Sequence, residues 1–344
     1  EIYTSLFVGS VRCVSETGVD RMRFPCPAAN MTIFINNNYM SLSKPFQTIK
    51  ITAICCLVLL ITACSTVRFA YNQGDTLIRW WIDDHIGLTT EQEFLTRELL
   101  EQQFWWHRTE QLTDVSNTLE QLRRQLHRPL STQEVSQFSD DLKKFIYAIA
   151  KKTTPDAAKI FVTLQSNQIE KMQKKMQKGN EKFLKQWLPP GVERQNKVRA
   201  DKVIDRVEWL FGSINKEQEE KIRQHIKNNP LDMNMVYQDR LRRQNDLLKV
   251  VRTIQQNKLN QQQAEELLTV YMKNFEYGTT KEQQDFGKKR AAIGVQLSSF
   301  ITHTMNDEQR KYASGRVETW ALDVQELVKE SAVLAAKRSA LPNR

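Results

Sequence analysis

The residues best suited to chemistry lie in two short segments that combine tryptophan with carboxylate or histidine. The first segment spans residues 79–85 and the second spans residues 105–107. Aromatic rings can stack on a sugar, while a neighbouring carboxylate or histidine carries out acid–base catalysis. The candidate surface or binding residues in these segments are Trp80, Trp81, Asp83, Asp84, Trp105, Trp106 and His107.

The expected geometry keeps the two segments apart. If the helices on either side of Gly87 form an antiparallel hairpin, Asp84 lies within one turn of the bend. His107 then lies about 20 residues further on, or roughly 30 Å along a helix. We therefore interpret both segments mainly as packing elements. One tryptophan of each pair is expected to be buried, and Asp83 or Asp84 is expected to pair with a lysine or arginine.

Other signatures of catalysis or metal binding do not occur in the sequence. The five histidines include no pair at positions i and i+4, so no metalloprotease motif is present. The sequence also has no serine elbow and no glycine-rich phosphate loop. We therefore predict no catalytic residues, no metal site and no cofactor, and we do not expect an enzyme.

A short apolar run near the N-terminus predicts a lipoprotein signal peptide. Residues 51–63 are apolar or small and are preceded by Lys44 and Lys50, but they are too few for the roughly 20 residues of a membrane-spanning helix. Thr62 and Ala63 are the small residues that a signal peptidase requires before the lipidated cysteine. A short uncleaved membrane segment with an incidental cysteine is the alternative.

The signal peptide predicts where the protein resides. We expect a signal peptide over residues 40–63 and lipidation of Cys64, with residues 1–39 as a disordered upstream extension. Several acyl chains at about 0.8 kcal/mol per buried methylene give a stable membrane anchor. Ser65 follows the cysteine, which favours the outer membrane with the body facing the periplasm.

Charge and cysteine content limit the partners of the exported body. Residues from Cys64 onward keep 45 basic and 37 acidic side chains, a formal charge of +8, and contain no other cysteine. A disulfide is therefore excluded. Export argues against nucleic acid as a partner. Anionic lipid head groups, lipopolysaccharide phosphates and peptidoglycan carboxylates are the polyanions of that compartment, and mixed-sign solvated helix faces are the alternative explanation.

The pattern from residue 66 onward is helical almost throughout, with eleven glycines and nine prolines in the whole chain. We predict an all-α, elongated bundle of about ten antiparallel helices. Residues 154–156 are expected to open a helix, with Pro155 in its first turn. Residues 189–191 suggest a boundary between parts 64–190 and 191–344, which are alternatively one domain. The expected helices cover residues 67–84, 90–126, 132–151, 155–188, 192–212, 216–227, 231–257, 261–277, 280–303 and 307–336.

Five of the predicted helix starts share one arrangement. Each has an apolar residue, then a capping residue, then Glu or Gln three positions later, which is a capping box. A strict repeat would need another box near position 173, where the sequence lacks one. We therefore interpret the boxes as shared helix-start chemistry rather than a solenoid repeat. The capping residues are Thr89, Ser131, Asn215, Asn260 and Asn306.

Several motifs from Cys64 to about residue 330 resemble a family of bacterial outer-membrane lipoproteins known only as a domain of unknown function. The resemblance implies an all-helical periplasmic protein and provides no activity or catalytic residues. Boxes such as 214–218 are also similar to the Leu-Thr-x-x-Gln boxes of small periplasmic helical chaperones. The motifs that carry the family resemblance lie at residues 67–72, 80–84, 88–92, 106–107, 155–158, 168–170, 180–183 and 206–218.

Two functions from different classes follow as hypotheses. The first is a lipid-anchored interaction or scaffold protein with a protein partner in the cell envelope, including a chaperone-like role. The alternative is a hydrolase or binding protein for peptidoglycan or another glycan, with residues 80–85 in its cleft. Two carboxylates within about 10 Å of each other in a pocket beside exposed tryptophans would favour the alternative.

Overall fold

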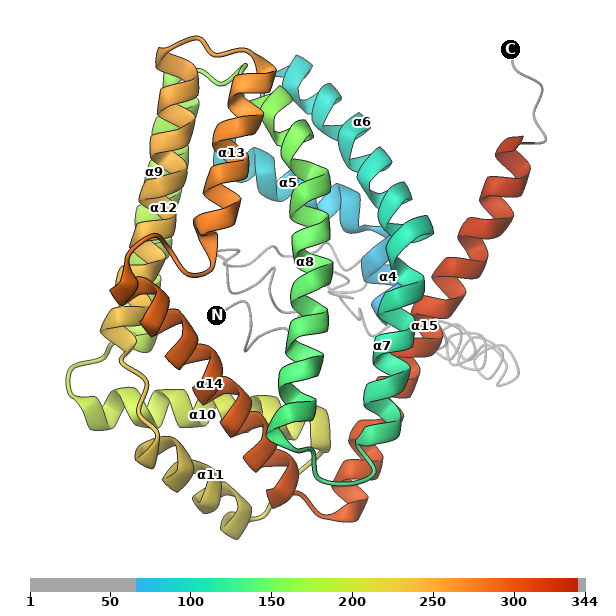
Figure 1. Ribbon diagram of the computed structural model, residues 1–344, viewed down its shortest axis with the longest axis vertical. Helices are drawn as coiled ribbons and strands as arrows, with labels where there is room; N and C mark the ends of the chain where they lie inside the picture. The colour runs from blue at the N-terminus through green and yellow to red at the C-terminus, as the bar shows by residue number, and fades with distance from the viewer. Residues whose placement is uncertain (1–65, 340–344) are drawn as a thin grey trace, which may run out of the picture.

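The computed structural model describes residues 66–339, which are helices joined by short loops without a β-strand among them (Figure 1). The prediction of an all-α bundle is therefore confirmed. The upstream extension, the signal peptide and Cys64 lie outside the described residues. The elements are α4 (Thr66–Asn72), α5 (Gly74–Ile86), α6 (Thr90–Trp106), the π-helical turn η1 (His107–Gln111), α7 (Leu112–Gln125), α8 (Thr132–Phe161), α9 (Ser166–Trp187), α10 (Val192–Phe211), α11 (Lys216–Asn228), α12 (Met233–Gln256), α13 (Gln261–Phe275), α14 (Lys281–Thr304) and α15 (Asp307–Ser339).

Two predicted helices are interrupted. The helix expected over residues 67–84 is divided at Gln73 into α4 and α5. The helix expected over residues 90–126 runs from α6 into α7 through η1, where the hydroxyl of Thr109 donates to the carbonyl of Trp105 at 3.0 Å. Such π-helical turns disturb the regular ladder of backbone hydrogen bonds, and the apolar periodicity does not reveal them.

The predicted helix start at Pro155 is wrong, because α8 continues through this residue to Phe161. The proline lacks the N–H that would donate to the carbonyl four residues earlier. The helix tolerates this loss because Ala158 is completely buried against Ala264 and Leu268 of α13. The break lies at residues 162–165 instead, where the side chain of Gln168 accepts from the backbone N–H of Gln165 at 3.0 Å.

The five predicted capping boxes are confirmed, and four glutamines of such boxes also pair in space. Gln92 and Gln168 each donate to the side-chain oxygen of the other, at the starts of α6 and α9. Gln218 and Gln309 do the same at the starts of α11 and α15. We call these pairs the N-terminal and C-terminal cap junctions.

The hydrophobic core crosses the predicted boundary near residue 190. The helices there end at Trp187 and begin again at Val192, as expected from the Pro-Pro-Gly sequence. One buried cluster nevertheless combines Leu122 and Leu126 of α7 with Leu210 of α10 and Val317 of α15. Packing is therefore continuous across this boundary.

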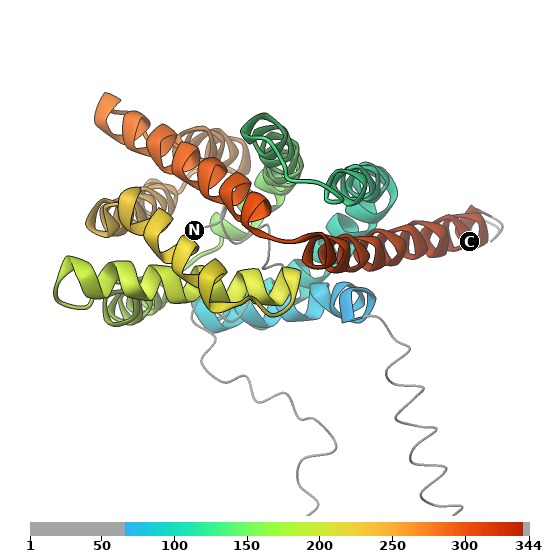
Figure 2. The same cartoon turned by 90° about the horizontal axis from the view of Figure 1, so that it is seen from below.

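The helices are arranged around α8, which lies in the middle of Figure 1. The pair α9 and α12 lies on one side of it and α6 with α7 on the other, while α14 crosses in front of α10. Figure 2 shows α15 extending away from the other helices toward the C-terminus. None of the helices within residues 66–339 combines the length and apolar character that a membrane span requires.

Candidate functional site

The first candidate segment lies on α5 and is partly exposed. Trp80 is 48% exposed, and Trp81 is half-buried and stacks on His85 with a ring separation of 4.2 Å. Both residues lie on α5, and Nδ1 of His85 also lies 2.8 Å from the backbone carbonyl of Trp81. Trp81 is therefore held by its own helix rather than buried in the core.

The carboxylates of this segment make structural contacts. Asp83 Oδ1 accepts from the backbone N–H of Leu88 at 2.9 Å, just after the end of α5. Asp84 forms an ion pair of 2.5 Å with Lys175 of α9. Burial alone would raise the pKa of Asp84, but the hydrogen bond and charge of Lys175 lower it. The expected pairing of an aspartate with a lysine or arginine is confirmed.

The second candidate segment, Trp105–His107, contacts other helices. Both of its tryptophans are half-buried, so the expectation that one tryptophan of each pair is buried in the core is wrong. Trp106 lies beside the ammonium of Lys152 of α8, 5.8 Å from the ring centre. His107 Nδ1 lies 2.7 Å from the hydroxyl of Tyr71 on α4, and burial lowers the pKa of His107. The partly polar surroundings of both pairs explain why their rings remain in contact with solvent.

These contacts separate the two segments, as their spacing predicted. Asp84 is bound to α9 and His107 to α4, so neither contact joins the carboxylates to the histidine. Within the described residues, no three histidine, cysteine or acidic side chains are grouped so that they could hold a metal ion. Asp84 and His107 therefore contact different helices rather than each other.

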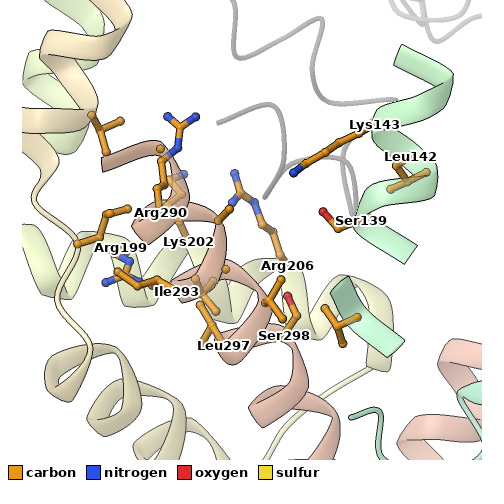
Figure 3. A pocket seen from close by; sticks show the side chains of 18 of the residues that line it. Ser139, Leu142, Lys143, Arg199, Lys202, Arg206, Arg290, Ile293, Leu297 and Ser298 are labelled. Atoms are coloured by element: carbon orange, nitrogen blue, oxygen red, sulfur yellow. The ribbon is translucent and has the colours of Figure 1, made fainter. Parts of the chain in front are cut away.

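A more developed site lies elsewhere, in a cavity of about 150 Å³ between α8, α10, α12 and α14. Figure 3 shows its side chains, and we call it the basic pocket. Its walls are largely apolar and include Phe138 of α8, Trp187 at the end of α9, Val203 of α10 and Met233 of α12. Apolar walls with a few convergent polar groups are typical of ligand sites in helical proteins.

Five cationic side chains and one carboxylate line this pocket. Figure 3 shows Lys143 and Arg206 extending from different helices toward the same space. Because like charges repel in a partly dry environment, an anion near them stabilises such convergence, and Glu276 already supplies one for Lys143. The cations are Lys143, Arg199, Lys202, Arg206 and Arg290, and the carboxylate is Glu276.

Arg199 is the most informative of these cations. Arg199 is only 8% exposed, and its guanidinium donates to the carbonyl of Asn229 at 3.0 Å. No carboxylate in the part of the chain that the structure describes forms an ion pair with it. Burial lowers the pKa of Arg199, and its charge adds to burial in lowering the pKa of His225. Arg199 is thus a buried cation without a counter-ion.

Two other cations of the pocket have carboxylate partners. Lys143 pairs with the buried carboxylate of Glu276 at 3.2 Å. Burial would raise the pKa of Glu276, but hydrogen bonds from Tyr147 and Tyr277 and the charge of Lys143 lower it. Both ends of this pair are therefore charged.

Arg290 shares its carboxylate with two further arginines. Asp239 of α12 lies 3.3 Å from Arg290, 2.8 Å from Arg242 and 3.1 Å from Arg243. One carboxylate thus faces three guanidinium groups, and all four side chains are 12–14% exposed. Arg242 also pairs with Asp246 at 3.2 Å, so these arginines share two carboxylates.

The sequence contained one signal for this site that the motif search did not use. Arg199, Lys202 and Arg206 follow one another at three- and four-residue steps, so they lie on one face of a helix. That spacing alone is also typical of a solvated helix face. The remaining walls come from other helices and from the end of α9, and only the fold brings them together.

The comparisons with known proteins place the chain by family alone. No curated protein and no solved structure matches it. The model of a family of unknown function (DUF6279) matches residues 84–276, which extend from the end of α5 through α13 and contain all the pocket cations except Arg290. Since this match covers more than half of the sequence, the chain belongs to the DUF6279 family of unknown function.

Proposed function

We propose that this protein is a lipid-anchored protein of the bacterial outer membrane that faces the periplasm and acts by binding an anionic ligand in the basic pocket. The observation that carries the binding role is Arg199, a buried guanidinium without a carboxylate partner. Burying an unpaired charge costs several kcal/mol, and a bound anion offsets this cost. This role differs from the envelope interaction or scaffold protein with a protein partner that the sequence predicted, which stays a prediction.

The location rests on the sequence before the described residues. The apolar run and the small residues before Cys64 have the order of a lipoprotein signal peptide, and Ser65 favours the outer membrane. Thr66, the first residue that the structure describes, already belongs to helix α4 and lies two positions after Cys64, so a lipid on that cysteine would hold the helical body close to the membrane surface. The anionic lipids and glycolipids of the envelope are then within reach of the protein.

A glycan-binding or hydrolytic role for residues 80–85 is the second candidate. The observation in its favour is Trp80, whose ring is 48% exposed beside Asp83 and Asp84. Against it, Asp83 caps the end of α5 and Asp84 is paired with Lys175. A carboxylate that is fixed in these ways is poorly suited to acid–base catalysis on a sugar.

Anion binding is tested by thermal unfolding of the mature, lipidated protein in neutral detergent. We expect inorganic phosphate to raise the unfolding temperature by a few degrees relative to chloride at equal ionic strength. Phosphate also stabilises proteins in general, so the comparison between variants is the readout. Lys202→Glu should remove most of the rise, whereas Arg194→Glu, at an exposed position of the same helix, should retain it.

One outcome would contradict the proposal. An equal rise of the unfolding temperature in the wild-type protein, Lys202→Glu and Arg194→Glu would mean that phosphate acts only as a general stabiliser. The proposal of an anion site would then be wrong. A binding titration with peptidoglycan fragments, followed by tryptophan fluorescence in the wild-type protein and in Trp80→Phe, tests the second candidate.

Lipid attachment is tested by mass spectrometry of protein extracted from membranes. We expect an acylated N-terminus at Cys64, and we expect Cys64→Ala to block both processing and attachment. An unmodified Cys64 within a longer chain would contradict the proposed location without affecting the proposal for the pocket.

A further inference from the structure

A second cavity of about 80 Å³ lies next to the basic pocket, between α10 and α14. The two cavities are adjacent because they have five lining residues in common, and we call the two together the path. Leu297 and Ser298 of α14, labelled in Figure 3, belong to both. The residues lining both cavities are Val203, Arg206, Gly294, Leu297 and Ser298.

The chemistry of the lining changes along this path. The basic pocket carries all five cations, whereas the second cavity has Arg206 as its one charged residue, at the end where the two cavities join. Beyond that point the walls are Leu210 and Phe211 of α10 and Ile301 of α14, with Thr302 beside them. A path that is cationic at one end and apolar at the other matches a ligand with an anionic head and an apolar tail.

The path is also narrow. Its two parts, about 150 and 80 Å³, are each well below the roughly 300–1,000 Å³ of pockets for compact drug-sized ligands. On the α14 side, the lining includes the small residues Ala291 and Gly294. A thin ligand such as one alkyl chain fits this shape, whereas a lipid with two chains does not.

The cations approach from three helices and therefore from different directions. Lys143 belongs to α8, Arg199, Lys202 and Arg206 belong to α10, and Arg290 belongs to α14. A phosphate carries about −1.5 to −2 charge and accepts hydrogen bonds around a tetrahedron, whereas a carboxylate accepts them near one plane. The buried Arg199 without a carboxylate partner and the spread of the cations around the pocket favour phosphate as the head group.

We propose that the ligand of the basic pocket is an amphiphile with one alkyl chain and a phosphate head group, with the head among the cations and the chain between α10 and α14. This inference rests on the proposed anion-binding function and specifies its ligand class. Burial of each methylene of the chain contributes to binding, and the charge-assisted hydrogen bonds of the arginines fix the orientation.

Photoaffinity labelling tests this proposal on the mature protein in phosphatidylcholine nanodiscs. The probe is dodecyl phosphate with a diazirine at the end of its chain, and dodecanol with the same diazirine is the neutral control. We expect the phosphate probe to label residues 207–211 and 297–302, and the alcohol to label them about tenfold less or weaker still. Unlabelled dodecyl phosphate should compete with the probe.

Two glycine variants form a matched pair for the chain-binding part. Gly294→Leu places a side chain where the two cavities join, and we expect it to reduce labelling by about tenfold. Gly315→Leu makes the same change on α15, where nothing lies within 4 Å of the added carbon, and should leave labelling unchanged. If Gly294→Leu does not fold, the labelled residues and the ratio of phosphate to alcohol in the wild-type protein decide the question.

Failure of this inference is distinguishable from failure of the proposed function. If inorganic phosphate stabilises the wild-type protein but the probe labels residues outside the path, the pocket binds an anion and the amphiphile proposal is wrong. Equal labelling by phosphate and alcohol also overturns the proposal, because the head group then contributes nothing. If phosphate does not stabilise the protein through Lys202 and labelling is scattered, both proposals are wrong.

Discussion

The two cap junctions use the same hydrogen bonds in different parts of the chain, but the helices that lead into them carry different side chains on their inner faces. In the N-terminal junction, Gln168 donates to the carbonyl of Gly87 at 2.7 Å, and Gln92 donates to that of Thr163 at 3.1 Å. In the C-terminal junction, Gln309 donates to Ser213 at 2.8 Å and Gln218 to Thr304 at 3.0 Å. In each case a glutamine closes the loop before the other helix.

The helices that lead into the two junctions also end alike. Both α5 and α10 stop at a glycine with positive φ, Gly87 at 74° and Gly212 at 82°. A residue with a side chain is strained in this conformation, so glycine suits a helix end of this kind. The same helix–glycine–box sequence therefore builds the same corner twice.

The side chains that precede the two glycines differ in chemistry. Counting back 13, 10 and 6 positions from Gly212 gives Arg199, Lys202 and Arg206. The same counts from Gly87 give Gly74, Leu77 and Trp81. Near the N-terminal junction, Ile86 packs in an aliphatic cluster with Leu248 and Val251 of α12, whereas α10 lines the basic pocket. The comparison shows that the capping residues determine where the helices turn, while the side chains on the helix face determine whether a pocket is apolar or cationic.

The largest expected effect comes from breaking a junction. Gln168→Leu leaves the carbonyl of Gly87, the N–H of Gln165 and the amide of Gln92 without their partner, so we expect a loss of about 2–3 kcal/mol in the free energy of unfolding. Gln218→Leu should cost a similar amount. Urea unfolding measures both losses, and the double variant Gln92→Leu/Gln168→Leu should lose less than the sum of its single variants.

The comparison becomes sharper if phosphate binding is measured on the same variants. Gln218→Leu loosens the corner that ends α10 and should weaken stabilisation by phosphate, whereas Gln168→Leu should leave it intact. If both variants lose less than about 0.5 kcal/mol in the free energy of unfolding, the glutamine pairs contribute little to stability and are not structural junctions.

Most of the frame could be predicted from the sequence because helix starts have local chemistry. The boxes at Ser131, Asn215 and Asn260 each predict the start of a helix where the structure has it. Pro155 misled the prediction because its local signal for a helix start was overridden by the burial of Ala158 against α13. The pairing of boxes could not be predicted, since it depends on contacts between residues 76 and 91 positions apart.

The next effect tests the cost of the buried charge itself. Without ligand, Arg199→Met should raise the free energy of unfolding by up to about 2 kcal/mol, because replacing an unpaired buried cation with an apolar side chain removes a desolvation penalty. Arg194→Met, at an exposed position of α10, should change it by less than about 0.5 kcal/mol. A clear loss of stability in Arg199→Met alone would show that the bond to Asn229 outweighs the charge and that Arg199 is a structural residue.

The site itself could be predicted only in part, for a related reason. Tryptophans next to carboxylates are the sequence pattern best suited to sugar chemistry, yet Asp83 caps the end of α5 and Asp84 pairs with Lys175 of α9. Charge periodicity on α10 was visible, but nothing local distinguishes a cation such as Lys202 that lines a cavity from one that faces water. Burial of Arg199 depends on the loop after α11, which the sequence around residue 199 does not specify.

The smallest effect concerns the box at Ser131, which has glutamate where both junctions have glutamine. Glu134 accepts from the backbone N–H of Ser131 at 3.0 Å and pairs with Arg128 at 2.6 Å, and these contacts lower its pKa from 4.5 to about 2, the hydrogen bond from Arg128 contributing most. Because the pKa is lower in the folded than in the unfolded protein, this stabilisation is complete above about pH 4.5 and is lost as the pH falls toward about 2.

The glutamine junctions cannot take up a proton in this range, so the acid-sensitive part of the capping should reside in the Ser131 box. Ser131→Ala should lower the free energy of unfolding by about 0.5–2 kcal/mol at pH 7. Glu134→Gln should lower the unfolding temperature slightly at pH 7, and the difference from wild type should shrink between pH 4.5 and pH 2. An NMR titration in which Glu134 takes up its proton near pH 4.5 would show that the carboxylate gains nothing from the cap, and a charged box would then behave like a neutral one.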